Sequence, residues 1–76
     1  MHNPRRRVPA DHARLAITAL RHDGLTLHQV AALAGTSHVA VARIHSGKRT
    51  QCEAHIATAI VAAWVTHTTR LAEEAA

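Results

Sequence analysis

The sequence is poor in aromatic residues and in cysteine. It contains no Phe or Tyr, one Trp and one Cys in 76 residues. A single cysteine excludes an intramolecular disulfide and fits a reducing compartment, so we expect a cytoplasmic protein. Proteins that bind RNA or single strands stack bases on aromatic side chains. The shortage of aromatic residues therefore favours duplex DNA over these ligands, should the partner be a nucleic acid.

Long apolar runs and catalytic or metal-binding motifs are also missing. No stretch approaches the roughly 20 apolar residues of a membrane-spanning helix, and no signal-peptide segment follows Arg7. The eight histidines show neither HExxH nor a Cys-and-His finger spacing. No Ser, His and acid arrangement stands out, and so small a chain leaves little room for a substrate pocket. We expect no membrane association, metal, other cofactor, small-molecule ligand or enzymatic activity.

The apolar residues that are present suit helices. The hydrophobic fraction is 47%, and much of it is alanine. Ala, Leu, Ile and Val allow helices to pack closely, whereas a sheet would want more aromatic and β-branched residues. A chain of this length supports one small core. We predict a single all-α domain over residues 10–76 with four to five helices.

Acidic residues are absent from the middle of the chain. Nine Lys and Arg oppose five Asp and Glu, giving a net charge of +4, and no acid lies between Asp23 and Glu53. That segment contains Arg43, Lys48 and Arg49. Basic charge concentrated in this way indicates a polyanionic partner.

Residues 1–9 contain two prolines and no period that could bury a face, so we predict a flexible, disordered or extended arm. Its three consecutive arginines are Arg5, Arg6 and Arg7. Such an arm could follow a minor groove, as basic arms of some DNA-binding domains do, or it could simply be solvated.

Helical periodicity begins near residue 10. The apolar residues of the first predicted helix, over about 10–22, are Ala13, Ala16, Ile17 and Leu20. Gly24 supplies its left-handed stop. Thr26 and Gln29 form a Thr-x-x-Gln capping box for a second helix. The residues expected on the inner side of this second helix are Val30, Ala31, Leu33 and Ala34.

A tight turn at Gly35 is predicted to separate the second helix from a third. Thr36 or Ser37 can cap this third helix, which should reach about His45. Residues 37–44 taken alone could pass for a short strand, but the Val41–Ile44 spacing favours a helix.

Residues 46–49 are predicted to form a basic loop that leads into a long last helix over about 51–72. Thr50 and Glu53 are expected to form its capping box. The stripe that is expected to close the core comprises Ile56, Ala59, Ile60 and Ala63.

Residues 26–46 have the features of a helix-turn-helix. Such a unit needs a small residue where its helices touch, a glycine at the turn and apolar anchors in the second helix. Ala31, Gly35, Val41 and Ile44 supply these in order. The segment resembles the motif of lambda-repressor-like regulators, and also lactose-repressor headpieces. The preceding helix and the basic loop resemble more closely the phage-repressor and xenobiotic-response-element branch, and the resemblance covers roughly residues 10–63.

The resemblance implies that the second helix of the unit lies in the major groove of double-stranded DNA, with its N-terminal residues at base edges. The base-reading residues carried over are Ser37, His38, Val39, Ala42 and Arg43. Arg43 can donate two hydrogen bonds to guanine, although an arginine there could also contact phosphate. The residues expected to contact phosphates at the flanks are Thr26, Thr36, Lys48, Arg49 and Thr50. The threonines could equally act only as caps.

A second apolar stripe on the last helix predicts a homodimer. It comprises Val61, Trp64, Thr68 and Leu71, whose 3-4-3 spacing is that of a short coiled-coil seam. A symmetric dimer could place two reading helices one DNA turn apart, roughly 34–36 Å. Alternatively, Trp64 folds back onto the first helix and completes the core.

These features predict a sequence-specific DNA-binding protein, a small bacterial or phage transcriptional regulator that represses by occupying its site. An excisionase-like architectural protein would use the same fold to bend DNA. A protein-interaction module, such as an antitoxin or a polymerase-binding adaptor, is the alternative from another class, against which the acid-free basic segment argues.

Overall fold

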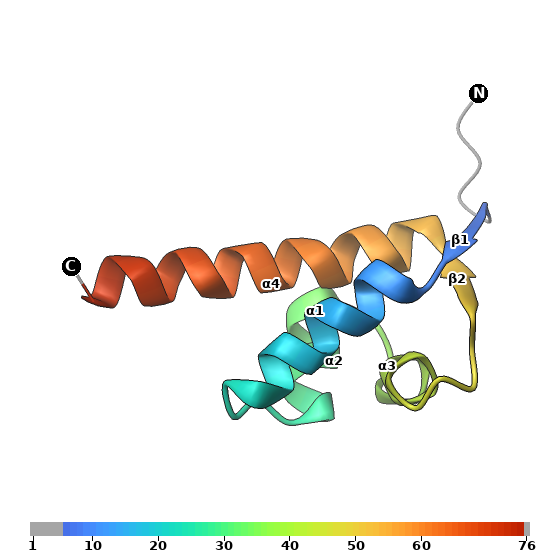
Figure 1. Cartoon of the computed structure of the whole chain (residues 1–76), viewed down its shortest axis with the longest axis horizontal. Coiled ribbons are helices and arrows are strands. Elements are labelled where there is room, and N and C mark those ends of the chain that lie inside the picture. The colour runs from blue at the N-terminus through green and yellow to red at the C-terminus, as the bar shows by residue number, and fades with distance from the viewer. Residues whose placement is uncertain (1–5, 76) are drawn as a thin grey trace.

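The computed structural model describes residues 6–75, which form four helices and one two-stranded sheet (Figure 1). The elements are β1 (Arg7–Pro9), α1 (Asp11–His22), α2 (Leu27–Ala34), α3 (His38–His45), β2 (Gln51–Glu53) and α4 (Ala54–Ala75). The prediction of a mainly helical chain is confirmed, but the sheet was not expected. Within residues 6–75 no helix has both the length and the apolar character that crossing a membrane requires.

The small sheet corrects two predictions. β1 runs antiparallel to β2, with Val8 opposite Cys52, so residues 7–9 are not a free arm. Gln51–Glu53 is the second strand, and the last helix therefore begins at Ala54 rather than near residue 51. The predicted capping box of Thr50 and Glu53 is wrong for the same reason. Pairing gives backbone groups of the two segments hydrogen-bond partners in each other, and Cys52 is buried.

The ends of the sheet are fastened to the helices by backbone hydrogen bonds. The Ala10 amide donates to the Thr50 carbonyl at 2.9 Å, and the Ala54 amide donates to the Arg6 carbonyl at 2.7 Å. The sheet thus ties the start of α1 to the start of α4.

The core lies where α1 meets the other helices. In Figure 1, α4 runs along the top, α1 slants away below it in front of α2, and α3 is seen end-on at the lower right. The largest fully buried side chains are Ile17, Leu20, Val30, Val41, Ile44 and Ile60. Alanines occupy the rest of the buried face of α1, which lets the helices approach closely. The predicted inner residues of the first helix are all buried.

The local signals at the ends of α2 and α3 are confirmed. Thr26 and Gln29 form both hydrogen bonds of a capping box. Gly35 ends α2 in the left-handed conformation at φ 67°, which explains the glycine at this position. The Ser37 hydroxyl accepts a hydrogen bond from the Ala40 amide and caps α3. Val41 and Ile44 are both buried, as expected for a helix.

Leu33 was predicted on the inner side of α2, and this is wrong because its side chain is 55% exposed. The buried side of this short helix follows Leu27, Val30, Ala31 and Ala34, a helical stripe that excludes residue 33.

Helix α4 extends well past the core. Its buried residues are Ile60 and Ala63, with Ile56 packed against the core at the edge. It ends at Ala75 rather than near residue 72. The C-terminal half projects beyond the other helices at the left of Figure 1.

Candidate nucleic-acid interface

Helix α3 has one buried side and one free side. Val41 and Ile44 are buried in the core, and α3 packs against both α1 and α2. The residues predicted to read bases lie on the free side or its border: Ser37, Val39 and Arg43 are exposed, while His38 and Ala42 are half-buried. Val39 is 53% exposed, so its side chain is accessible to a partner.

Two stacked histidine rings lie between the starts of α2 and α3. The rings of His28 and His38 stack in parallel, with centroids 3.8 Å apart and planes at 4°. Each lies in the first turn of its helix, so the two N-termini come together. Helix N-termini carry free N–H groups and partial positive charge, which suits an anion such as a phosphate. Neither first turn contains an acidic residue that would oppose this.

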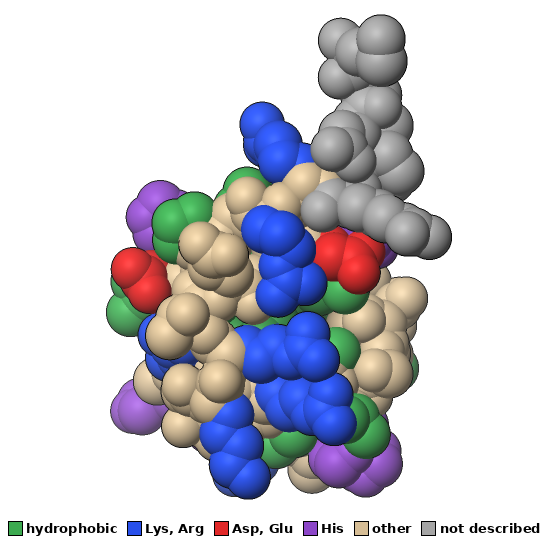
Figure 2. Space-filling model, turned by 90° about the vertical axis from the view of Figure 1, so that its right-hand side faces the viewer, with side chains coloured by type: hydrophobic (Ala, Val, Ile, Leu, Met, Phe, Trp, Pro, Cys, Tyr) green, Lys and Arg blue, Asp and Glu red, His purple; other side chains and the backbone are tan. Residues whose placement is uncertain are grey.

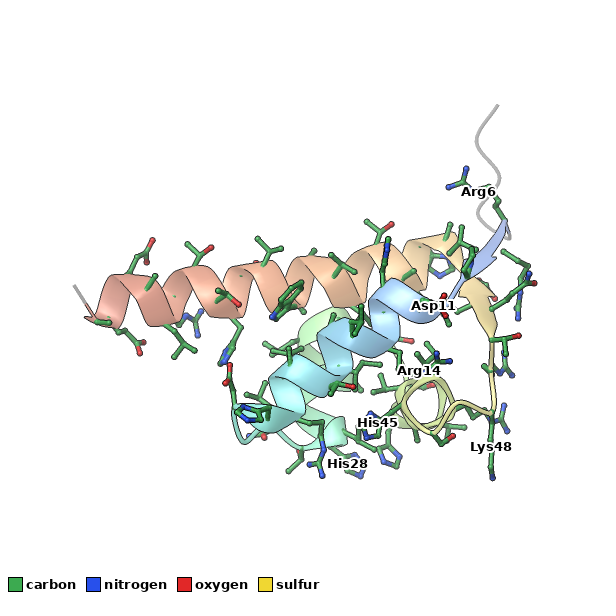
Figure 3. All side chains as sticks on the ribbon, viewed as in Figure 1. Arg6, Asp11, Arg14, His28, His45 and Lys48 are labelled. Atoms are coloured by element: carbon green, nitrogen blue, oxygen red, sulfur yellow. The ribbon has the colours of Figure 1, made fainter. Side chains whose placement is uncertain are left out.

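The basic side chains gather at one end of the molecule. Figure 2 faces the end that carries β1, β2 and α3, and shows Lys and Arg side chains in a column, with acidic groups beside it. In Figure 3, Arg6 marks the top of this end and Lys48 the bottom. The exposed basic residues of β1, α3 and the segments directly beside them, which we call the basic column, are Arg6, Arg7, Arg43, Lys48 and Arg49.

Arg7 of strand β1, and Arg6 directly before it, join the basic column through the sheet and the Ala54–Arg6 backbone hydrogen bond. The Arg7 guanidinium donates to the Gln51 carbonyl at 3.2 Å, which holds it across the sheet. The sheet therefore positions these two residues, which the sequence had predicted to lie on a flexible arm. Arg5 lies outside the described residues.

Arg14 is a functional candidate that the sequence did not reveal. Its Nε donates to the Ile44 carbonyl near the end of α3 at 2.9 Å, and its Nη2 donates to the Arg49 carbonyl at 2.8 Å (Figure 3). Asp11 lies 3.5 Å from its Nη1. The cation thus caps the negative end of α3 and fixes the basic loop. On α1 the residue stands next to buried Ala13, but nothing in this local spacing identifies its partners.

Strand β2 carries one further chemical group, the Cys52 thiol. Cys52 lies opposite Val8 of β1 and is buried at 3% exposure. Burial raises the pKa of the Cys52 thiol; nearby Arg7 lowers it and Glu53 raises it further. The thiol is therefore protonated and shielded at neutral pH, a structural group rather than a nucleophile.

No protein-family model, no curated protein and no solved structure matches this chain. The site must therefore be interpreted from its own residues. Over residues 6–75, no group of three or more His, Cys, Asp or Glu side chains is placed to hold a metal ion. What the interface offers is a free helix face, two helix N-termini and a column of cations.

The other predicted site residues fall into separate places. Thr26 is an exposed cap at the start of α2, and Thr36 is half-buried in the turn. Thr50 is exposed, and its carbonyl accepts from Ala10. The predicted seam lies on α4, apart from the basic column: Val61 is half-buried, Thr68 is exposed, and Trp64 and Leu71 are 38% and 42% exposed.

Proposed function

We propose that this protein binds double-stranded DNA in a sequence-dependent manner, with α2 and α3 acting as a helix-turn-helix of the lambda-repressor-like kind. The observation that carries the proposal is the free side of α3, which adjoins the basic column and carries no acid. A recognition helix in the major groove needs one free side, anchoring apolar residues on the other, and cations where the phosphates pass.

In this arrangement the start and free side of α3 meet base edges. Arg43 is the residue best equipped to read a base, since its guanidinium can donate to guanine O6 and N7 together. Val39 offers an apolar contact of the kind that a thymine methyl accepts. Ser37 and His38 supply polar groups at the same end of the helix, and Ala42 leaves room for close approach.

Phosphate contacts would surround this reading surface. Lys48 and Arg49 come from the loop after α3, Arg7 comes from β1, and Arg6 directly precedes β1. The paired N-termini near His28 and His38 offer N–H groups to a further phosphate. A protein of this size that occupies a site would act by excluding other proteins from it, which makes a transcriptional repressor of bacterial or phage type the role we propose.

Selection of bound sites from random duplex DNA tests the proposal directly. We expect an enriched motif for the wild type. With that motif, Arg43→Ala should weaken binding by about 1–3 kcal/mol and relax the preference at one base pair. Arg70→Ala removes the same charge from an exposed site on α4 and serves as the matched control. No enriched motif, with equal weak binding to all duplexes, would refute sequence-dependent binding; equal losses for both variants would show that Arg43 acts only through charge.

A further inference from the structure

The two stacked histidines at the starts of α2 and α3 have ring nitrogens that no other residue engages. Their centroids lie 3.8 Å apart, and the ring planes are 4° from parallel. His28, labelled in Figure 3, is exposed, and His38 is half-buried. Within residues 6–75, no hydrogen bond or ion pair involves a ring nitrogen of either residue. The nitrogens of this pair, which we call the histidine stack, are therefore available to a ligand.

The acidic residues of the chain lie away from the histidine stack. Helices α2 and α3 and the turn between them contain no acid. Of the five acidic residues, two lie in the last turn of α4, Glu73 and Glu74. The other three pair with a basic side chain at 3.5, 3.4 and 3.3 Å, respectively Asp11 with Arg14, Glu53 with His55, and Asp23 with His67. A negative charge beside the histidine stack must therefore come from a ligand.

The remaining ionisable groups around α2 and α3 are basic. Arg21 of α1 donates to the Leu25 carbonyl at 3.1 Å, two residues before α2 begins. Helices α1 and α4 pack against α2, and α1 packs against α3. The other basic and histidine side chains of α1, α3, the loop after α3 and α4 are His12, Arg14, His22, Arg43, His45, Lys48, Arg49, His55, His67 and Arg70. This balance of charge suits an anion such as a DNA phosphate.

We propose that the histidine stack takes up a proton when the protein binds DNA, so that DNA affinity rises as the pH falls through the range in which histidines titrate. This rests on the proposed function, in which the starts of α2 and α3 meet a phosphate. A neutral imidazole has one N–H, whereas the protonated ring has two and carries a positive charge. A phosphate beside the stack favours the charged ring, which donates an N–H to a phosphate oxygen. The buffered solvent supplies the proton.

The histidine stack should take up no more than about one proton, because two protonated rings with centroids 3.8 Å apart would repel each other. Since the bound state holds more protons than the free state, lowering the pH favours binding. A change from about pH 8 to about pH 5.5 crosses the range in which histidine ordinarily titrates. We expect the affinity to rise by about 3- to 10-fold over this range, the contribution of one partly exposed, charge-assisted hydrogen bond.

Fluorescence anisotropy at constant ionic strength across this pH range measures the affinity for the selected motif and for a random duplex. The affinity of the wild type should rise for both duplexes, since every sequence presents phosphates. Replacing both rings together, by His28→Gln and His38→Gln, leaves polar side chains that cannot take up a proton and should remove most of the rise. The matched control combines His12→Gln with His22→Gln, which removes two exposed histidines of α1 and should keep the rise. Calorimetry in two buffers of different ionisation enthalpy counts the protons taken up.

Proton uptake and DNA binding can fail separately in this experiment. A wild type that binds the selected motif with the same affinity at every pH would overturn proton uptake and leave DNA binding intact. A rise that persists in the variant without His28 and His38 would place the proton on another group, and equal losses in the two double variants would reduce the effect to net charge; either result overturns the proposal. Absence of binding to any duplex at every pH would refute the DNA-binding function itself, and proton uptake with it. Circular dichroism over the same pH range establishes that each protein is folded.

Discussion

Replacing Arg14 by alanine should destabilise the protein far more than removing another arginine of the same helix. Arg14 holds the Ile44 and Arg49 carbonyls with hydrogen bonds of 2.9 and 2.8 Å. Its side chain is 30% exposed, so these bonds are partly shielded from water. The substitution leaves the end of α3 and the basic loop without their common anchor on α1.

The expected magnitude follows from these two bonds. A hydrogen bond to a charged group contributes about 1.5–3 kcal/mol when shielded. The Arg49 carbonyl is reached by solvent and counts for less, and the exposed contact with Asp11 adds little. The free energy of unfolding should therefore fall by about 2–3 kcal/mol, which for a domain of this size lowers Tm by roughly 10–20 °C.

Arg21→Ala is the matched control for Arg14→Ala. Arg21 lies on the same helix and makes one exposed hydrogen bond, to the Leu25 carbonyl at 3.1 Å. Both variants lose one positive charge, but Arg21→Ala should cost only about 0.5–1 kcal/mol. Arg14→Lys keeps the charge and can reach one carbonyl. Its loss in the free energy of unfolding should lie between the losses of Arg14→Ala and Arg21→Ala.

Thermal unfolding by circular dichroism measures these stabilities, and hydrogen exchange of residues 46–50 reports on the loop. We expect faster exchange of this loop in Arg14→Ala than in Arg21→Ala under native conditions, because only Arg14 is bonded to it. Equal changes in Tm and unchanged loop exchange would refute the anchoring role of Arg14.

Three further predictions concern the loop, a cap and the buried thiol. Lys48→Ala and Arg49→Ala should each weaken binding to all duplexes alike and reduce the log–log salt slope by roughly 1, as measured by fluorescence anisotropy; an unchanged slope would place both side chains away from DNA. Thr26→Ala should lower the free energy of unfolding in urea by about 1 kcal/mol, whereas Thr26→Ser keeps the capping hydroxyl; equal stability of both variants would contradict the capping role. Because burial raises the pKa of Cys52, the unfolded thiol ionises first, so stability should decline as pH rises above its ordinary pKa of 9.0. Cys52→Ala should remove the part of this decline in stability that comes from the thiol. An identical pH dependence of stability in the wild type and the variant would contradict a contribution from Cys52.

The sequence determined the helix pair because its signals are local. The hydroxyls of Thr26 and Ser37 cap amides three residues away, and Gly35 provides the one left-handed residue that the turn needs. Each signal acts within one helical turn, so the ends of α2 and α3 could be predicted from neighbours in the chain. The candidate residues on the free side of α3 followed directly from that register.

Only the tertiary structure revealed the contacts between distant segments that position the N-terminal basic residues, residues 51–53 and the partners of Arg14. Arg7 and Glu53 lie opposite each other although far apart in sequence, and this pairing replaced the local capping signal of Thr50 and Glu53. The same is true of Arg14, whose two carbonyl partners lie at residues 44 and 49. Pairing between distant strands leaves no periodic pattern in the sequence. An arginine that donates to backbone carbonyls leaves none either, because every residue has a carbonyl. A basic arm in the sequence thus became part of a basic column only through contacts between distant segments.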